Sequence, residues 1–394
     1  MQNIVIDKPY EFVPPHRGRW WPWLLQRGLR RRLRRKYGIM AVECQGVEKL
    51  RASQAQGHAI LLAPNHCRPC DPEVVQELSR QLGVFPYIMA SWHLFMQGWL
   101  QTFLLRRIGA FSIYREGMDR AALHMAVDLL VDGARPLLIF PEGVVTRTND
   151  RLNPLQEGVA FIARAAARKR AKATPPGQVV IHPLALRYRF GGDVRQSVEP
   201  VLSEIEHRLT WRPQNNLALE VRIAKVGQAL LALKEIEYLG QPQGGAIGER
   251  LEHLIDALLV PLEKEWFNEA RQAHVVARVK QLRAAVLPDM VQGDLSEAER
   301  ARRWTQFADM YLAQQLSCYP PDYVASRPTP ERILETVERF EEDITDQCRT
   351  NSPMWVTATI GDAIVVSPAR ERGGDDPVLP EIERQLQQLL GINQ

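Results

Sequence analysis

Residues 59–78 read AILLAPNHCRPCDPEVVQEL, an apolar run followed by a polar turn and an amphipathic pattern. The apolar run 59–63 is bounded by glycine and proline, which predicts a short buried strand. The residues after Pro72 follow an amphipathic helical pattern, and Asp71 suits the N-cap of that helix. The stretch therefore predicts a strand, a turn and a helix, with His66 and Asp71 in the turn.

The turn carries a possible proton-transfer pair. A histidine beside a carboxylate can act as a general base, with the carboxylate orienting the ring. In a parallel sheet, turns at the carboxyl ends of strands are where ligands gather. A histidine in a loop is nevertheless often only a polar side chain, and Asp71 has a complete role as a helix cap. His66 and Asp71 are candidates that need support from the rest of the chain.

The composition fits a globular protein of two domains, or of one domain with a large insertion. The chain has 394 residues, 45% of them hydrophobic and 24% charged, with a formal net charge of +4. Its five cysteines form no regular framework, which favours reduced thiols and a cytosolic location. We expect no transmembrane helix, since no apolar run reaches roughly 18 residues. We find no signal-peptide pattern and no internal repeat.

Residues 16–36 are rich in tryptophan and arginine and contain no acidic residue. Indole rings prefer the water–lipid interface, and arginines attract anionic lipid. If helical from Pro22, the segment is a basic amphipathic helix lying among lipid headgroups. A nucleic-acid-binding arm or a solvated charged helix would have a similar charge, but the clustered tryptophans favour a membrane over nucleic acid. We predict residues 1–37 as a membrane-surface segment that binds anionic phospholipid, placing the protein peripherally on the cytoplasmic face.

Residues 38–195 alternate short apolar runs with helical patterns, which predicts an α/β domain with a mostly parallel sheet flanked by helices. The expected strands are 40–44, 59–63, 86–89, 110–114, 136–140 and 179–187. The expected helices lie near 72–82, 93–107, 118–132 and 157–170.

A mainly helical insertion is predicted at residues 196–350, before the last strand. Apolar residues between Ile247 and Leu262 fall on one helical stripe, and Ser296 with Glu299 forms a capping box. Strand patterns return at 355–360 and 363–366, and an amphipathic helix ends the chain. We therefore expect residues 351–394 to complete the α/β domain.

Two further strand ends carry polar side chains. The run that begins at Gly109 ends at Arg115. The run 137–140 is followed by Glu142, Gly143 and Arg147. Two guanidinium groups at strand ends can grip a phosphate, and a glycine lets backbone approach a ligand. Taken singly, these arginines are more often surface charges and Glu142 could merely cap a turn.

Together the blocks resemble the glycerolipid acyltransferase superfamily, which includes lysophosphatidate and glycerol-3-phosphate acyltransferases. Its members carry an NH-x4-D block, a G-x-x-x-I-x-R block, an F-P-E-G block and a proline-containing strand. Here these are similar to Asn65-His66 through Asp71, Gly109 through Arg115, Phe140 through Gly143 with Thr146-Arg147, and residues 181–185. The resemblance covers about residues 38–190, and residues 361–366 look like the family's closing strand.

The resemblance implies that His66 takes a proton from an acceptor hydroxyl while Asp71 holds its ring. It also implies that Arg115, Arg147, Glu142, Gly143 and Gly109 contribute to the acceptor site. The donor would be an acyl-CoA or acyl carrier protein thioester, and neither a metal nor another cofactor is required. We expect a lysophospholipid or glycerol phosphate acceptor. The alternatives are an acceptor without phosphate, or a non-catalytic lipid-binding or scaffold protein of the same fold.

The chain departs from the family at two places. The first block has Cys67, Arg68 and Cys70 where many members have a serine, and Arg68 could add a phosphate contact. Two valines follow Gly143 where many members have Thr-Arg directly. The C-x-x-C supplies only two ligands, whereas a structural zinc site takes four, so we interpret both cysteines as packing residues.

Overall fold

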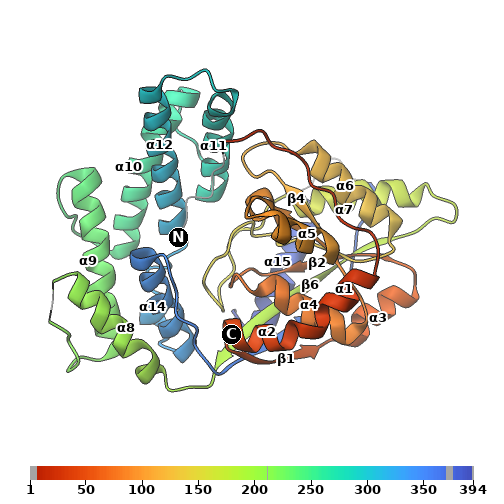
Figure 1. Ribbon diagram of the computed structural model, residues 1–394, viewed down its shortest axis with the longest axis horizontal. Coiled ribbons are helices and arrows are strands. Elements are labelled where there is room, and N and C mark those ends of the chain that lie inside the picture. The colour runs from red at the N-terminus through yellow and green to blue at the C-terminus, as the bar shows by residue number, and fades with distance from the viewer. Residues whose placement is uncertain (1–6, 211, 370–375, 393–394) are drawn as a thin grey trace. The chain divides into compact units, whose positions relative to one another are not determined.

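The computed structural model describes residues 7–210, 212–369 and 376–392 (Figure 1). Parts of two predicted segments, residues 1–6 and residues 370–375 and 393–394, lie outside the described residues. The chain forms two compact units, here called the helical unit and the sheet unit. The helical unit comprises Met1–Glu11, Arg115–Met118 and Asp193–Arg349, and the sheet unit comprises Phe12–Tyr114, Asp119–Gly192 and Thr350–Gln394.

The sheet unit is built on an 8-stranded sheet. Its strands are β1 (Ile39–Gln45), β2 (Ala59–Pro64), β3 (Tyr87–Ser91), β4 (Ala110–Ile113), β5 (Leu137–Leu138), β6 (Val179–Phe190), β7 (Met354–Ile360) and β8 (Ile364–Val365). The order is β1-β7-β6-β2-β5-β3-β4, with β8 paired to β6. All pairs are parallel except those that β6 makes with β7 and β8. The predicted fold class is confirmed.

Strands β7 and β8 run in succession along β6, and the interruption between them faces a proline. The amide of Gly361 donates to the carbonyl of Pro183 at 2.8 Å. Pro183 has no amide to return a bond, and the ring of His182 contacts the Gly361 carbonyl through Nδ1 at 2.9 Å instead. The closing strands therefore belong to the same sheet as the motif-bearing strands, as predicted.

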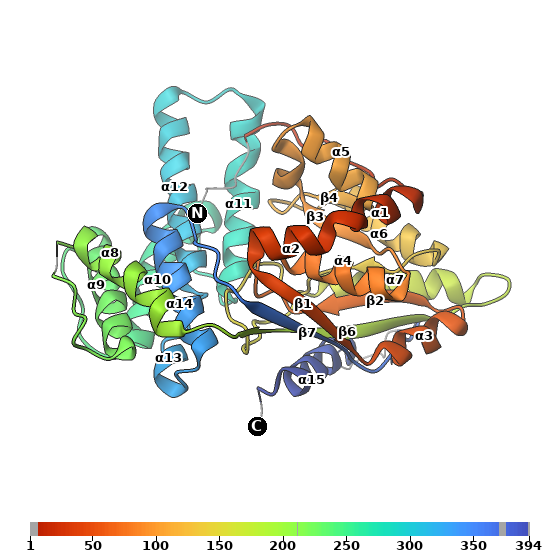
Figure 2. The same ribbon diagram turned by 60° about the horizontal axis from the view of Figure 1, so that its bottom comes forward.

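Helices cover both faces of the sheet (Figure 2). Odd-numbered residues of β2 pack in one core with α6 (Arg120–Asp132), α7 (Gly158–Ala171) and α15 (Val378–Leu390). On the other face lie α2 (Leu29–Tyr37), α3 (Val47–Ala55) and α4 (Asp71–Leu82). Figure 2 shows α2 and α4 on the side of the sheet opposite α15. The continuous apolar run of β2 is explained by burial on both faces.

Two predicted helices are broken where the structure has 3₁₀ turns. The expected helix 93–107 is a 3₁₀ turn at Trp92–Met96 followed by α5 (Trp99–Ile108), because Gly98 adopts φ +122° and ends the helical path. The expected helix from Pro22 starts earlier, as α1 (Trp20–Leu25), and the 3₁₀ turn Gln26–Gly28 separates it from α2.

The helical unit contains α8 (Val194–Arg208), α9 (Leu219–Leu239), α10 (Ile247–Phe267), α11 (Val275–Gln292), α12 (Glu297–Leu316), α13 (Tyr323–Ser326) and α14 (Pro330–Thr345). The predicted apolar stripe on α10 is confirmed, since Leu254, Leu258 and Leu259 are buried. Ser296 caps α12 by accepting from the amide of Glu299 at 3.3 Å, as the capping box predicts.

A repeated glutamate–arginine clamp joins successive helices of this unit. Glu206, Glu235 and Glu263 each accept an amide from the following loop, at Gln214, Gln243 and Arg271. The same carboxylates pair with Arg222, Arg250 and Arg278 at the start of the next helix. The clamp recurs at a period of about 28 residues, the kind of spacing that marks helical repeats. The recurring feature is a few buried contacts and not a run of similar residues, so it does not stand out in the sequence.

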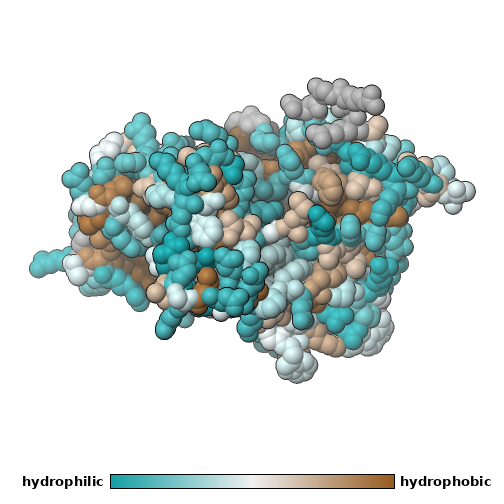
Figure 3. Space-filling model, turned by 90° about the horizontal axis from the view of Figure 1, so that it is seen from above, coloured by the Kyte–Doolittle hydropathy of each residue, from teal (hydrophilic) through white to brown (hydrophobic). Residues whose placement is uncertain are grey.

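The surface shown in Figure 3 has hydrophilic residues interspersed with smaller hydrophobic patches. In the described part of the chain, no helix combines the length and apolar character that crossing a bilayer requires. The prediction of no transmembrane helix is borne out to that extent.

Candidate active site

The carboxyl ends of β2 and β5 lie together because these strands are parallel neighbours. The turn after β2 is held against β6 by Asn65, whose side chain forms a two-way bond with the backbone of Leu186. The amide of Leu186 donates to Asn65 Oδ1 at 2.7 Å, and Asn65 Nδ2 donates to the Leu186 carbonyl at 3.1 Å. Pairing between β2 and β6 ends at Leu184, so Asn65 satisfies backbone groups that a strand would otherwise bind.

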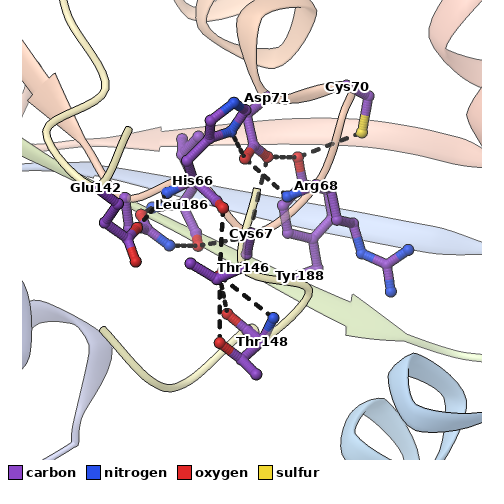
Figure 4. A network of polar contacts seen from close by, with 11 residues as sticks. His66, Cys67, Arg68, Cys70, Asp71, Glu142, Thr146, Thr148, Leu186 and Tyr188 are labelled. Atoms are coloured by element: carbon purple, nitrogen blue, oxygen red, sulfur yellow. Dashed lines mark hydrogen bonds and ion pairs between the residues drawn. The ribbon is translucent and has the colours of Figure 1, made fainter. Parts of the chain in front are cut away.

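His66 and Asp71 are in direct contact (Figure 4). His66 Nδ1 lies 2.9 Å from Asp71 Oδ2. The imidazole stacks on Phe140, with ring centroids 4.0 Å apart, and its side chain is 15% exposed. With Nδ1–H donating to the carboxylate, Nε2 is left as an acceptor. This is the geometry that proton abstraction by histidine requires.

Asp71 does not cap helix α4, which corrects the sequence prediction. The helix begins at Asp71 itself, and its N-cap, Cys70, makes no side-chain cap bond. The Asp71 carboxylate turns back over the loop, where Oδ2 also accepts the amide of Arg68 at 2.8 Å. Its other oxygen accepts the hydroxyl of Tyr188 at 2.5 Å. The fully buried carboxylate therefore stabilises the turn that holds His66.

Glu142 fixes the backbone of the same turn. Its Oε1 accepts the amide of His66 at 2.6 Å, and Oε2 accepts the amide of Asn153 at 2.9 Å. Burial raises the pKa of Glu142 to about 7, although the two amide donors act in the opposite direction. Gly143 follows with φ +72°, a left-handed conformation that favours glycine. Glu142 therefore positions the loop that carries the histidine.

The two extra valines after Gly143 do not separate the next residues from the site. Thr146 donates to the His66 carbonyl through its amide at 2.8 Å and through Oγ1 at 3.2 Å. Arg147 then adopts φ +60° and is partly buried. The longer loop returns to the histidine turn from the β5 side.

Sequence reasoning missed Asn149 and Tyr188. Asn149 bonds the amide and carbonyl of Tyr188 at 2.6 and 2.7 Å, repeating on β6 what Asn65 does two residues earlier. Tyr188 is fully buried, which raises its pKa well above the ordinary value, so the phenol stays a donor to Asp71. The available signal was a tyrosine at an inward position of β6, where a buried hydroxyl needs a partner.

The two cysteines of the turn are buried. Cys67 Sγ lies 3.9 Å from Asp71 Oδ1, and Cys70 Sγ lies 3.5 Å from the Tyr188 hydroxyl. Burial raises the pKa of Cys70 to about 12, which keeps that thiol protonated at neutral pH. Arg68 lies over the ring of Tyr188, with its guanidinium carbon 5.3 Å from the ring centroid. Among the described residues, no three His, Cys, Asp or Glu side chains gather as metal ligands.

Two other predicted site residues, Gly109 and Arg115, flank strand β4. Gly109 precedes β4, at the amino end of the strand, and its φ of +101° and the Arg135 guanidinium beside it leave no room for a side chain. Arg135 donates to the carbonyls of Ile108 and Pro86 at 3.0 and 3.2 Å. Gly109 therefore has a packing role. Arg115 comes two residues after β4 and groups with the helical unit.

The structure thus brings together His66, Asp71, Arg68, Glu142 and the start of the Thr146 loop at the carboxyl edge of a parallel sheet. A histidine held by a buried carboxylate at this edge of an α/β sheet has a geometry that can support general-base chemistry.

Comparison with known families agrees with this class. Residues 41–187 match the model of the acyltransferase family, so this part of the chain is similar to that family. The resemblance found in the sequence motifs is confirmed, and the match supports acyl transfer as the general activity. A search among curated proteins found no match to the chain.

Proposed function

We propose that this protein is a membrane-surface O-acyltransferase that moves a fatty acyl chain from a thioester to a hydroxyl of a lysophospholipid or glycerol phosphate. The observation that carries the proposal is the contact of 2.9 Å between His66 Nδ1 and Asp71 Oδ2, in a domain similar to the acyltransferase family. Burial and three donors hold the carboxylate in one place, which limits the histidine to one orientation.

In this proposal His66 Nε2 takes the proton from the acceptor hydroxyl, and Asp71 stabilises the imidazolium that forms. The hydroxyl oxygen attacks the thioester carbonyl carbon. The tetrahedral intermediate collapses with cleavage of the carbon–sulfur bond, and His66 returns the proton to the departing thiolate. The products are an ester and a free thiol of coenzyme A or acyl carrier protein, and no other co-substrate is needed.

The acceptor's phosphate is the proposed ligand of the strand-end arginines Arg115 and Arg147, with Arg68 as a further contact. Guanidinium groups suit this task because they bind phosphate oxygens in pairs. Gly143 lets the backbone approach the acceptor. Glu142 positions the backbone of His66 by accepting its amide. Gly109 contributes through the packing of Arg135 and not by contact with substrate.

Attachment to a membrane is supported by tryptophans on two neighbouring helices. Trp20 on α1 is 58% exposed and Trp99 on α5 is 80% exposed, although large apolar side chains are usually covered. The helices are packed together through Trp21 and Phe103, whose ring centroids lie 5.5 Å apart. Arg107 stacks on the same pair of rings, at 5.2 and 4.8 Å. Exposed indoles beside arginines fit the headgroup region of an anionic bilayer.

Helix α2 contributes less to this surface than its sequence suggests. Its apolar residues Leu29 and Leu33 are buried inside the protein. Its arginines Arg30 and Arg32 pair with Glu77 and Glu73 of α4 at 2.8 and 2.7 Å. We therefore assign the lipid contact mainly to α1 and α5, here called the tryptophan surface.

An acceptor panel tests the reaction. Labelled acyl-CoA and acyl carrier protein would be offered with lysophosphatidate, glycerol 3-phosphate and monoacylglycerol. The proposal predicts a labelled ester with a phosphate acceptor. Transfer only to monoacylglycerol favours an acceptor without phosphate, and no transfer from either donor to any acceptor favours a non-catalytic lipid-binding protein.

Vesicle flotation tests the membrane part. The triple variant W20A, W23A and W99A should lose binding to vesicles that contain anionic phospholipid. The matched control is F161A, because Phe161 is equally exposed, at 59%, but lies on α7. Equal binding of the triple variant and F161A would contradict the tryptophan surface.

A further inference from the structure

A groove runs along one side of helix α5 in the sheet unit. Its volume is about 470 Å³, which is in the range of sites for small ligands. Its lining includes Phe95, Met96, Trp99, Phe103 and Arg106. The last three of these are three or four positions apart, so they share one face of α5 and span about 10 Å along its axis. The groove is therefore long enough to hold an extended chain.

The lining of the groove is mostly apolar and partly open to solvent. Phe95 is buried and Phe103 half-buried, whereas Met96 is 42% exposed and Trp99 is more exposed still. Among the described residues, no acidic side chain lines the groove. A hydrocarbon chain in this position would remove exposed apolar side chains from water, which is favourable. Because Trp99 also belongs to the tryptophan surface, the groove opens where we have proposed the lipid contact.

Arg106 supplies a positive charge at one end of the groove. Its Nε donates to the carbonyl of Pro14 at 3.0 Å, and its own carbonyl accepts the amide of His16 at 3.0 Å. Within the described part of the chain, its two terminal nitrogens make no hydrogen bond or ion pair. They are available to bind the phosphate of a lipid whose chain lies in the groove.

The direction of α5 shows which lipid this arrangement suits. Strands β2, β5, β3 and β4 are parallel neighbours, and α5 leads from the carboxyl end of β3 to the amino end of β4. Arg106, in the last turn of α5, lies toward the amino edge of the sheet, whereas His66 follows the carboxyl end of β2. A lipid with its phosphate at Arg106 therefore has its headgroup directed away from the general base. This orientation suits a bilayer lipid and not the acyl acceptor.

We propose that the groove along α5 binds one acyl chain of an anionic bilayer phospholipid, with Arg106 holding its phosphate. The site deepens the membrane part of the proposed function, on which it rests for the source of the lipid. It adds a specifically bound lipid to the contact that the tryptophan surface makes with the bilayer. Membrane attachment then depends on both the chain and the charge of one lipid molecule.

Calorimetric titration with dihexanoyl phosphatidylglycerol, below its micelle concentration, tests the site without a bilayer. The full-length protein should bind this lipid with a negative change in heat capacity, which marks the burial of apolar surface. Inorganic phosphate should give no such change. Equal heat-capacity changes with the lipid and with inorganic phosphate would overturn the proposal, because only a headgroup would then be bound.

Two variants test the two ends of the groove in the same titration. M96D introduces a charge that a bound chain would have to cover, and it should weaken lipid binding about 10-fold or more. R106Q should weaken it about 5-fold, since the arginine is exposed. The matched controls are M40D and R51Q, because Met40 is 39% exposed on β1 and Arg51 is exposed on α3. Equal lipid affinity in M96D and M40D would contradict the groove as the site.

Vesicle flotation and an inhibition assay identify the source of the chain. M96D and R106Q should bind vesicles that contain anionic phospholipid less well than M40D and R51Q do. If the wild type binds the monomeric lipid but no vesicle, the membrane part of the proposed function fails, and the bilayer source with it. If the wild type and M96D bind vesicles equally, the proposed function stands and this inference fails. Acyl transfer to glycerol 3-phosphate that the short lipid inhibits in the wild type but not in M96D would assign the groove to a substrate chain and also overturn the inference.

Discussion

Asp71 and Arg283 are both buried charges, but their surroundings differ completely. In the sheet unit, Asp71 is 0% exposed and receives bonds from His66, Arg68 and Tyr188. In the helical unit, Arg283 has no bonded partner among the described residues. A fully partnered charge holds its neighbours in place, whereas an unpartnered buried charge lowers stability. The comparison assigns Asp71 a positioning role in the turn that carries His66.

The largest effect is expected for D71N. The amide keeps the shape of Asp71 but cannot stabilise the imidazolium or hold Nδ1–H of His66 as firmly. We predict a fall in kcat of about 10³-fold or more, equivalent to about 4 kcal/mol. The measurement is acyl transfer at saturating substrates. D132N is the control, since Asp132 is exposed at the end of α6, and similar rates for D71N and D132N would refute the orienting role.

Two arginine substitutions in the helical unit compare how a paired and an unpaired buried charge affect the free energy of unfolding. R222M leaves Glu206 buried without its guanidinium and should lower the free energy of unfolding by about 3–5 kcal/mol. R283M removes a charge that has no partner, so its free energy of unfolding should be equal to that of the wild type or higher. Urea unfolding followed by circular dichroism measures both. A large destabilisation by R283M would mean that Arg283 is a structural residue.

Glu142 gives the sheet unit a pH dependence of stability. Because its pKa rises from 4.5 to about 7 on folding, the folded state keeps a proton between these values that the unfolded state loses. The stabilisation from this proton is complete below pH 4.5 and is lost as pH rises through 7, a change of about 3 kcal/mol. In E142Q, this part of the pH dependence of the free energy of unfolding should be absent. Unfolding measured from pH 4.5 to 7.5 checks this. An unchanged slope contradicts the raised pKa.

The smallest effect is expected for Y188F. The variant removes one donor from the Asp71 carboxylate and leaves the ring in the core. We predict a loss of stability of about 1–2 kcal/mol and a fall in kcat smaller than that of D71N. Thermal unfolding and the same transfer assay check both values. A rate as low as that of D71N would show that Tyr188, and not the histidine contact, sets the position of Asp71.

Much of the sheet unit was predictable because its strands and turns carry strong local signals. A few adjacent residues are enough to recognise the apolar run of β2, the turn at His66 and the F-P-E-G block. Helix breaks were harder to foresee. Gly98 ends a helix in this chain, whereas many glycines within helical patterns do not.

The contacts that complete the site could not be predicted, since they join residues distant in sequence. Tyr188 reaches Asp71 across 117 positions, and Asn149 reaches Tyr188 across 39. The N-cap assigned to Asp71 was wrong for the same reason. Local rules favour a cap, but the carboxylate gains more from His66, the Arg68 amide and the buried phenol. The recurring glutamate–arginine clamp of the helical unit was not predicted, because it consists of separate ion pairs between helices.

Thiol release from an acyl thioester, in the presence of a phosphate-bearing acceptor, tests the central claim most directly. The wild type, H66A and the control H124A would be compared, since His124 is an exposed histidine of α6. Our account predicts that H124A releases thiol at the wild-type rate and that H66A is slower by about 10³-fold or more. Equal release by H66A and the wild type would contradict the assignment of His66 as the general base.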